Sequence, residues 1–123
     1  MMTTNIHPTA IIHPTAQIDP SARIGAGVVI GEGCVISADV VICDGVVIGS
    51  HVHIGWLVRI YDGATIAAHV RIRADGGVGM GALIGSHALI GRGAIVGSNV
   101  VIQADEEVGD DAIVGRTRAI SHG

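Results

Sequence analysis

The chain has 123 residues, of which 49% are apolar, and a formal net charge of −4. It is too apolar for a disordered chain, and its acidic balance leaves no general footprint for nucleic acid or an anionic membrane. Polar residues and glycine interrupt every apolar run well before the roughly 18 residues of a membrane span. The N-terminus has no signal-peptide pattern, and two cysteines make no disulfide framework. We therefore expect one cytoplasmic domain over residues 1–123.

A period of six residues runs through the chain. Every sixth position from Ile6 to Ile120, 20 positions in all, is Ile or Val, and no insertion shifts the phase. The position two residues earlier is nearly always small, and glycine follows the large aliphatic in half of the cases. This period fits neither a helix nor a long strand. It predicts a short strand of small, outward and large residues, then a three-residue turn, with no helix longer than one turn. The repeats cover 6–120, after a lead-in at 1–5 and before a tail at 121–123.

Two stretches carry a resemblance to a known family. Residues 6–16 read IHPTAIIHPTA and residues 18–25 read IDPSARIG, which resembles the N-terminus of hexapeptide-repeat acyltransferases, above all the UDP-N-acetylglucosamine acyltransferases. Residues 91–102, GRGAIVGSNVVI, are similar to γ-carbonic-anhydrase-like proteins. The resemblance implies an all-β fold, a single-stranded left-handed parallel β-helix with three hexads per coil. The 20 hexads then make nearly seven triangular coils.

Residues 18 apart should stack one strand spacing apart, so the outward residues fall into three columns. Face A carries Asn5, Arg23, Val41, Arg59, Gly77, Ile95 and Ile113. Face B carries Ile11, Val29, Val47, Thr65, Leu83, Val101 and Ala119, and face C carries Gln17, Val35, His53, Arg71, Leu89 and Glu107. Only face B is almost wholly apolar. A long apolar strip indicates an interface, although strands also favour branched residues outside. We predict a homotrimer, as is usual in the resembling family, packed through Ile11, Val29, Val47, Leu83 and Val101.

The strongest chemical signal is a column of histidines. His51, His69 and His87 are 18 residues apart, at the turn from face B to face C, and Asp105 continues the column. Two charges about 5 Å apart repel by roughly 3 kcal/mol at an effective dielectric near 20. Three adjacent imidazolium ions are therefore not expected at neutral pH without an anion, a metal or Asp105 to compensate.

The surroundings of the column indicate a substrate site. His53, Arg71, Arg73 and Arg92 are close to it in the repeat and form a candidate binding site for phosphate groups. With the resemblance, this predicts an acyltransferase with His69, His51 or His87 as general base and His69 favoured. The donor would be acyl-CoA or acyl carrier protein, and the acceptor a sugar or nucleotide-sugar hydroxyl or amine. We expect no covalently bound cofactor and no metal.

Other interpretations stay open at this stage. The histidines are also ordinary turn residues, since Gly-Ser-His occurs twice. The unbroken repeat equally suits a non-enzymatic trimeric scaffold. The γ-carbonic anhydrases need a third histidine where this chain has Arg92, so a zinc site is incomplete. Cys34 is expected in the core and Cys43 in a turn, without a bridge. Prolines in the first coil and charges over 105–118 predict a complete small protein with blunted ends.

Overall fold

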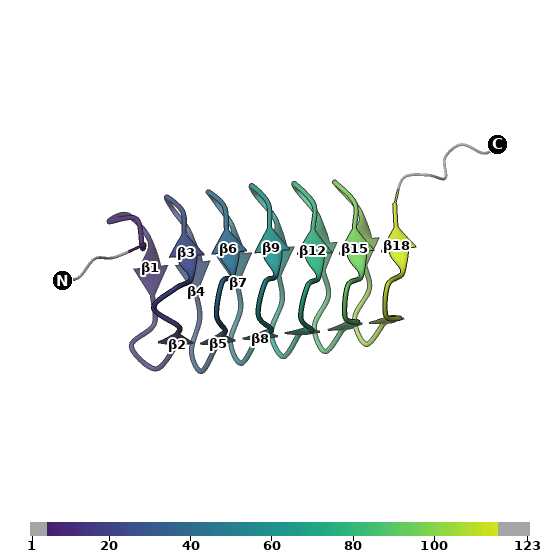
Figure 1. Ribbon diagram of the computed structural model, residues 1–123, viewed down its shortest axis with the longest axis horizontal. Helices are drawn as coiled ribbons and strands as arrows, with labels where there is room; N and C mark the ends of the chain where they lie inside the picture. The colour runs from purple at the N-terminus through teal and green to yellow at the C-terminus, as the bar shows by residue number, and fades with distance from the viewer. Residues whose placement is uncertain (1–4, 116–123) are drawn as a thin grey trace.

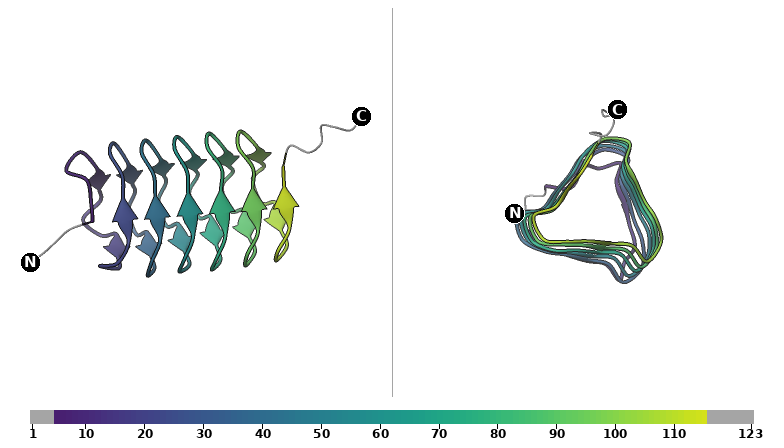
Figure 2. Two further views of the ribbon diagram at one scale, coloured as in Figure 1. Left: turned by 45° about the horizontal axis from the view of Figure 1, so that its top comes forward. Right: turned by 90° about the vertical axis from the view of Figure 1, so that its right-hand side faces the viewer.

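The structure is a computed structural model and describes residues 5–115. Eighteen two-residue strands form three parallel six-stranded sheets in six coils (Figure 1). Viewed along the long axis, the coils superpose as a triangular prism (Figure 2). This is the predicted all-parallel β-helix, and it is consistent with left-handed coiling. No helix occurs among the described residues, and so none there crosses a membrane. Ile120, Ala119 and the last charges of the repeat lie outside the described part.

Each sheet contains every third strand of the chain and corresponds to one predicted face. Face A is the sheet of β3 (Arg23–Ile24), β6 (Val41–Ile42), β9 (Arg59–Ile60), β12 (Gly77–Val78), β15 (Ile95–Val96) and β18 (Ile113–Val114). Face B consists of β1 (Ile11–Ile12), β4 (Val29–Ile30), β7 (Val47–Ile48), β10 (Thr65–Ile66), β13 (Leu83–Ile84) and β16 (Val101–Ile102). Face C consists of β2 (Gln17–Ile18), β5 (Val35–Ile36), β8 (His53–Ile54), β11 (Arg71–Ile72), β14 (Leu89–Ile90) and β17 (Glu107–Val108).

The predicted spacing of 18 residues is the register of the structure. Arg71 pairs with His53 below it and with Leu89 above it, and every other strand pair keeps the same offset. The strands are one residue shorter than predicted, because in hydrogen bonds between coils the small residue accepts but does not donate; where its amide donates, as in Ala82 to the Gly79 carbonyl, it does so within its own turn. The amide of Ile11, for example, donates to the carbonyl of Val28 at 2.8 Å. The small residue still faces the interior, as Val28 and Val58 show with no exposed surface.

The core is a filled column of aliphatic side chains. The large residue of each central hexad is almost fully buried, as Ile60 and Ile84 show with no exposed surface. Small residues such as Val58 and Ala82 fill the space between them. Among the described residues the core holds no polar or charged side chain. Burial of these aliphatic side chains is the main favourable contribution to the free energy of folding. Each coil is covered by the coils on either side of it, as in other solenoids.

Two cysteines lie where the repeat predicts. Cys34 is buried in the core, and its thiol lies 3.0 Å from the Gly49 carbonyl oxygen, within hydrogen-bond distance. Cys43 is half-buried at the turn from face A to face B, and neither forms a disulfide. Burial raises the pKa of the Cys34 thiol. Burial first, and then the charges of Asp62 and Asp44, raise the pKa of the Cys43 thiol.

Candidate functional site

Each turn places one residue of its hexad in the left-handed backbone conformation. From Gly27 to Asp111 every sixth residue has a φ between 58° and 73°, and glycine fills six of these 15 positions. His51, His69 and His87 occupy three others, with φ values of 58°, 64° and 63°. Histidine, like Asn and Asp, enters this region more often than other side chains do. The repeat geometry therefore accounts for the backbone of the column.

Backbone hydrogen bonds fix the three histidines to the preceding coil. The amides of His51, His69 and His87 donate to the carbonyls of the coil before, at 2.7, 2.9 and 3.1 Å. The His51 ring lies over Gly33, where an added Cβ would lie 2.5 Å from Nδ1. Successive rings therefore project onto the coil before their own and meet one another.

The predicted column of histidines is present as a stack of rings. The ring centroids of His51 and His69 are 5.3 Å apart, and the two planes differ by 15°. Those of His69 and His87 are 4.8 Å apart and differ by 13°. His69 is therefore the middle ring of the column. All three rings are exposed and can meet a ligand directly.

A hollow of about 590 Å³ lies beside the column and extends over face C; we call it the basic hollow. Its lining consists of His51, His53, His69, Arg71, Arg73, His87, Ala88, Leu89 and Glu107. Two guanidinium groups and four imidazoles there face one carboxylate. Its volume falls within the usual range of small-molecule sites. Guanidinium groups recognise carboxylates and phosphates through paired hydrogen bonds.

The structure brings together six of the seven predicted site residues. Arg71 on β11 lies between His53 and Leu89 on face C, and Arg73 follows at the next corner. Arg92 does not line the hollow. It lies in the turn from face C to face A, one position further along its turn than Arg73 and one coil later. Arg92 belongs to the column of Trp56 and Ala74, neither of which lines the hollow.

Within residues 5–115, no group of three or more His, Cys, Asp or Glu side chains is placed to hold a metal ion. The histidine column holds its rings face to face, whereas a metal ion needs nitrogen atoms directed at one point. The chemistry that imidazole rings offer at the column includes proton transfer and anion binding.

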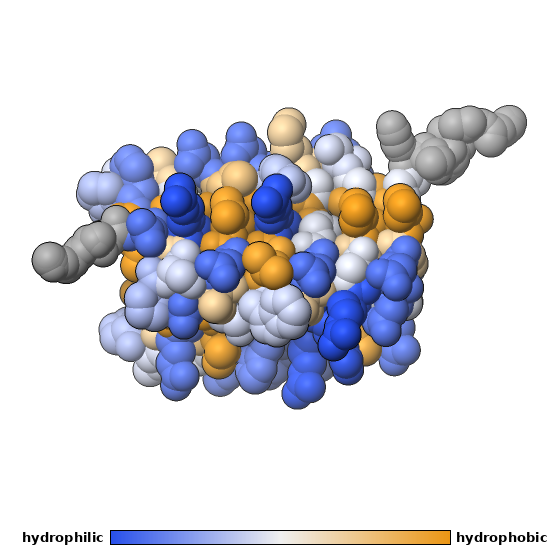
Figure 3. All heavy atoms as spheres, in the orientation of Figure 1, coloured by the Kyte–Doolittle hydropathy of each residue, from blue (hydrophilic) through white to orange (hydrophobic). Residues whose placement is uncertain are grey.

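Face B is exposed along its length, as predicted. Ile11, Val47, Leu83 and Val101 are exposed large apolar residues on that face, while Val29 and Thr65 are half-buried. Face A is mixed: in Figure 3 hydrophilic groups lie over β3 and β9, and apolar groups gather over β15 and β18. Face C has no exposed large apolar residue within the described chain. Face B borders the histidine corner.

The chain was compared with known protein families and solved structures. Residues 3–38 match the family described as bacterial transferase hexapeptide (six repeats). No curated protein sequence matches the chain. The resemblance to hexapeptide-repeat proteins is therefore confirmed, by this match and by the solenoid itself.

Three solved structures are similar in fold. The acetyltransferase domain of PglB from Neisseria gonorrhoeae, in complex with acetyl coenzyme A, aligns with a TM-score of 0.74 at 23% identity, over 87% of this chain and 54% of its own. A variant of AntD, an N-acyltransferase from Bacillus cereus in complex with dTDP and coenzyme A, aligns at 0.69 and 22%, over 89% and 69%. PerB from Caulobacter crescentus, in complex with coenzyme A and GDP-perosamine, aligns at 0.52 and 23%, over 89% and 50%. The chain thus spans about half the length of the first and the third.

Proposed function

We propose that this protein is an acyltransferase that moves an acyl group from coenzyme A or acyl carrier protein to a sugar or nucleotide-sugar hydroxyl or amine. The observation that carries the proposal is the stack of three histidines opening onto a basic hollow. The fold neighbours PglB, AntD and PerB, solved with acetyl coenzyme A or coenzyme A, support the choice of donor. No covalently bound cofactor is needed for this reaction.

His69 is the proposed general base. It is the middle ring of the column and lines the hollow with Arg71 and Arg73. A neutral ring nitrogen accepts the proton of the acceptor hydroxyl or amine as that atom attacks the thioester carbonyl carbon. The carbon–sulfur bond then breaks, and the leaving thiolate takes the proton from His69. His51 and His87 are alternative bases, because their rings lie on either side.

The cationic residues of the basic hollow are proposed to bind the substrates. Arg71, Arg73 and His53 can pair with the phosphates of the carrier or of a nucleotide sugar. Arg92 does not line the hollow, so it is left out of this proposed binding site. A neighbouring subunit in a homotrimer packed through face B would cover one side of the hollow, because face B adjoins the histidine corner.

The test is a transfer assay with acetyl coenzyme A and a panel of amino sugars and nucleotide sugars, read as thiol release. We expect His69→Asn to lower kcat about 100-fold or more, the usual contribution of a general base. Asparagine is chosen because Asn99 holds the equivalent turn position with a φ of 61°. His7→Ala, an exposed histidine in the first coil, is the control and should keep full activity.

Two results would overturn these assignments separately. Full activity in His69→Asn rejects this histidine as the base while leaving the acyl transfer in place. A wild-type protein that is inactive on the whole panel and is not thermally stabilised by coenzyme A rejects the acyltransferase. That second result favours the non-enzymatic trimeric scaffold.

A further inference from the structure

Face A has a gap in its column of outward side chains. Gly77 is the only glycine among the 18 outward strand positions of the described chain. It pairs with Arg59 on one side and with Ile95 on the other, so two long side chains flank a residue that has none. An added Cβ at Gly77 would meet nothing nearer than the Arg59 carbonyl oxygen at 4.0 Å. The missing side chain therefore leaves open space over β12.

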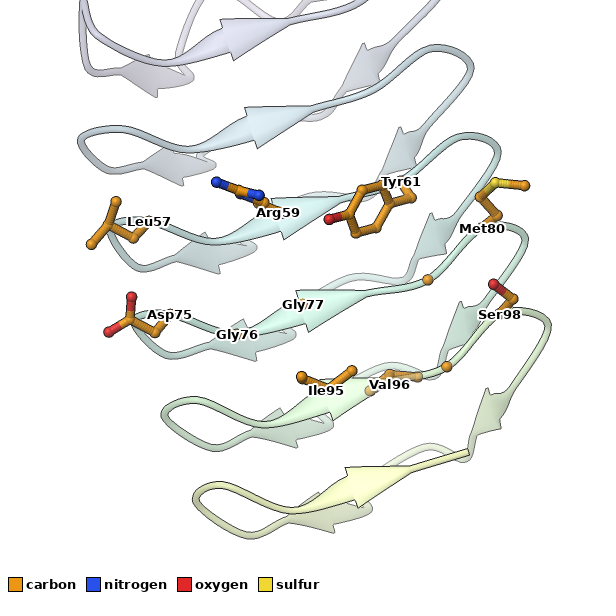
Figure 4. Close-up of a pocket in the computed structure, with 12 residues that line it drawn as sticks. Leu57, Arg59, Tyr61, Asp75, Gly76, Gly77, Met80, Ile95, Val96 and Ser98 are labelled. Atoms are coloured by element: carbon orange, nitrogen blue, oxygen red, sulfur yellow. The ribbon is translucent and has the colours of Figure 1, made fainter. Parts of the chain in front are cut away.

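This space is a hollow of about 630 Å³, which we call the glycine slot. Figure 4 shows Arg59 and Tyr61 along its β9 side and Ile95 along its β15 side. Leu57 and Asp75 close the slot at one corner of the prism, and Met80 and Ser98 lie at the other end. The strands that bound it are two spacings apart, roughly 10 Å. Its floor is backbone, its walls are mainly apolar, and it is long enough for a ring and a substituent.

The rim of the slot carries residues that the repeat does not require. Trp56 and Tyr61 are the only aromatic residues of the chain, they lie five positions apart, and they are 49% and 42% exposed. Tyr61 lines the slot, whereas Trp56 does not. Leu57 lies between them with a φ of 64°. That conformation costs a bulky side chain about 1–2 kcal/mol, and the other residues of its column with a positive φ are Asp39, Asp75, Gly93 and Asp111. Costly conformations of this kind concentrate at binding sites.

The charge of the slot indicates the ligand. The Arg59 side chain makes no ion pair or hydrogen bond with any residue of 5–115, although Asp75 is on the same rim. An unpaired guanidinium beside an apolar floor fits a carboxylate, which it binds through two parallel hydrogen bonds. Tyr61 and Met80 offer a ring and a thioether, both of which favour contact with another aromatic ring. The carboxylate of Asp75 repels a second anion and so directs the ligand's carboxylate toward Arg59.

We propose that the glycine slot binds a small planar aromatic carboxylate. Its ring lies on the backbone of Gly77 between Tyr61 and Ile95, and its carboxylate pairs with Arg59. Face A is opposite the corner between faces B and C, which holds the histidines, so this site does not depend on the proposed acyl transfer.

The test uses 2-naphthoate as the probe and two-dimensional NMR of the ¹⁵N-labelled full chain as the readout. We expect saturable shifts at the amides of Gly76, Gly77 and Gly79, and a weaker response to the neutral 2-naphthamide. Gly77→Val restores the side chain that the column lacks, in open space and at a φ that valine accepts. It should weaken binding at least tenfold without loss of fold. Arg59→Gln should weaken naphthoate binding at least fivefold and leave naphthamide unchanged.

Two control substitutions lie outside the slot. Arg23→Gln removes an equivalent cation from face A two coils away, and Thr65→Val replaces an outward hydroxyl by a methyl group on face B. Both should bind naphthoate as the wild type does. The proposal is overturned if Gly77→Val binds within twofold of the wild type, if naphthamide binds as tightly as naphthoate, or if the shifts fall on His51 and His69. It is also overturned if Gly77→Val lowers the sedimentation coefficient, because the slot would then be a contact between subunits.

Discussion

Removal of a central core side chain tests how the solenoid is stabilised. Ile60 lies in the middle of face A with no exposed surface. Ile60→Ala deletes three buried carbons, worth about 0.8 kcal/mol each on transfer, and leaves a cavity that adds about 1 kcal/mol more. We expect a loss of about 3–4 kcal/mol in the free energy of unfolding. The same deletion at Ile113, which is 74% exposed, should cost no more than about 0.5 kcal/mol.

The assay is urea unfolding followed by far-UV circular dichroism and by the fluorescence of Trp56. If the two probes give coincident curves, the coils unfold together. If the dependence of the unfolding free energy on urea concentration is also the same in variant and wild type, their free energies of unfolding can be compared directly. At a few degrees per kcal/mol for a domain of this size, Ile60→Ala should also lower Tm by about 10–20 °C. The reasoning is refuted if Ile60→Ala costs less than about 1.5 kcal/mol, or if Ile113→Ala costs as much as Ile60→Ala.

Two further predictions concern the surface and the thiols. Leu83→Asp with Val101→Asp should turn the predicted homotrimer into monomers in sedimentation velocity, whereas Ile113→Asp on face A should not; a wild-type monomer, or a double variant that remains a trimer, contradicts the face B interface. At pH 8 the native protein should react with a thiol reagent only at Cys43, and slowly, because burial and the acidic neighbours raise the pKa of that thiol. Cys34 should react only on unfolding, since burial raises its pKa as well; a native Cys43→Ser variant that still reacts would show that the core is open.

The fold was predictable from the sequence because one period governs the whole chain. A strict six-residue spacing limits the register to multiples of six, and the three hexads per coil implied by the resemblance select an offset of 18, which pairs Arg71 with His53 and Leu89. The stack of His51, His69 and His87 follows from the same spacing. What the spacing could not give is the direction of a side chain within a turn. Arg73 and Arg92 are one coil and one position apart, and that single position separates a residue of the basic hollow from one outside it.

The glycine slot was missed for a related reason. A search for chemical residue types finds histidines and arginines, whereas this hollow is made by the absence of a side chain at Gly77. Its signal in the sequence is a departure from the column: glycine where face A otherwise carries Asn, Arg, Val or Ile, and Leu57 where its own column otherwise carries Ser, Asp or Gly. In a solenoid the repeat fixes what each position needs for folding, so a residue that departs from its column calls for a separate explanation. The residues that depart from it, at a cost in strain or in exposed aromatic surface, are the ones that folding does not explain. In this chain three of them, Leu57, Tyr61 and Gly77, converge on one hollow on face A.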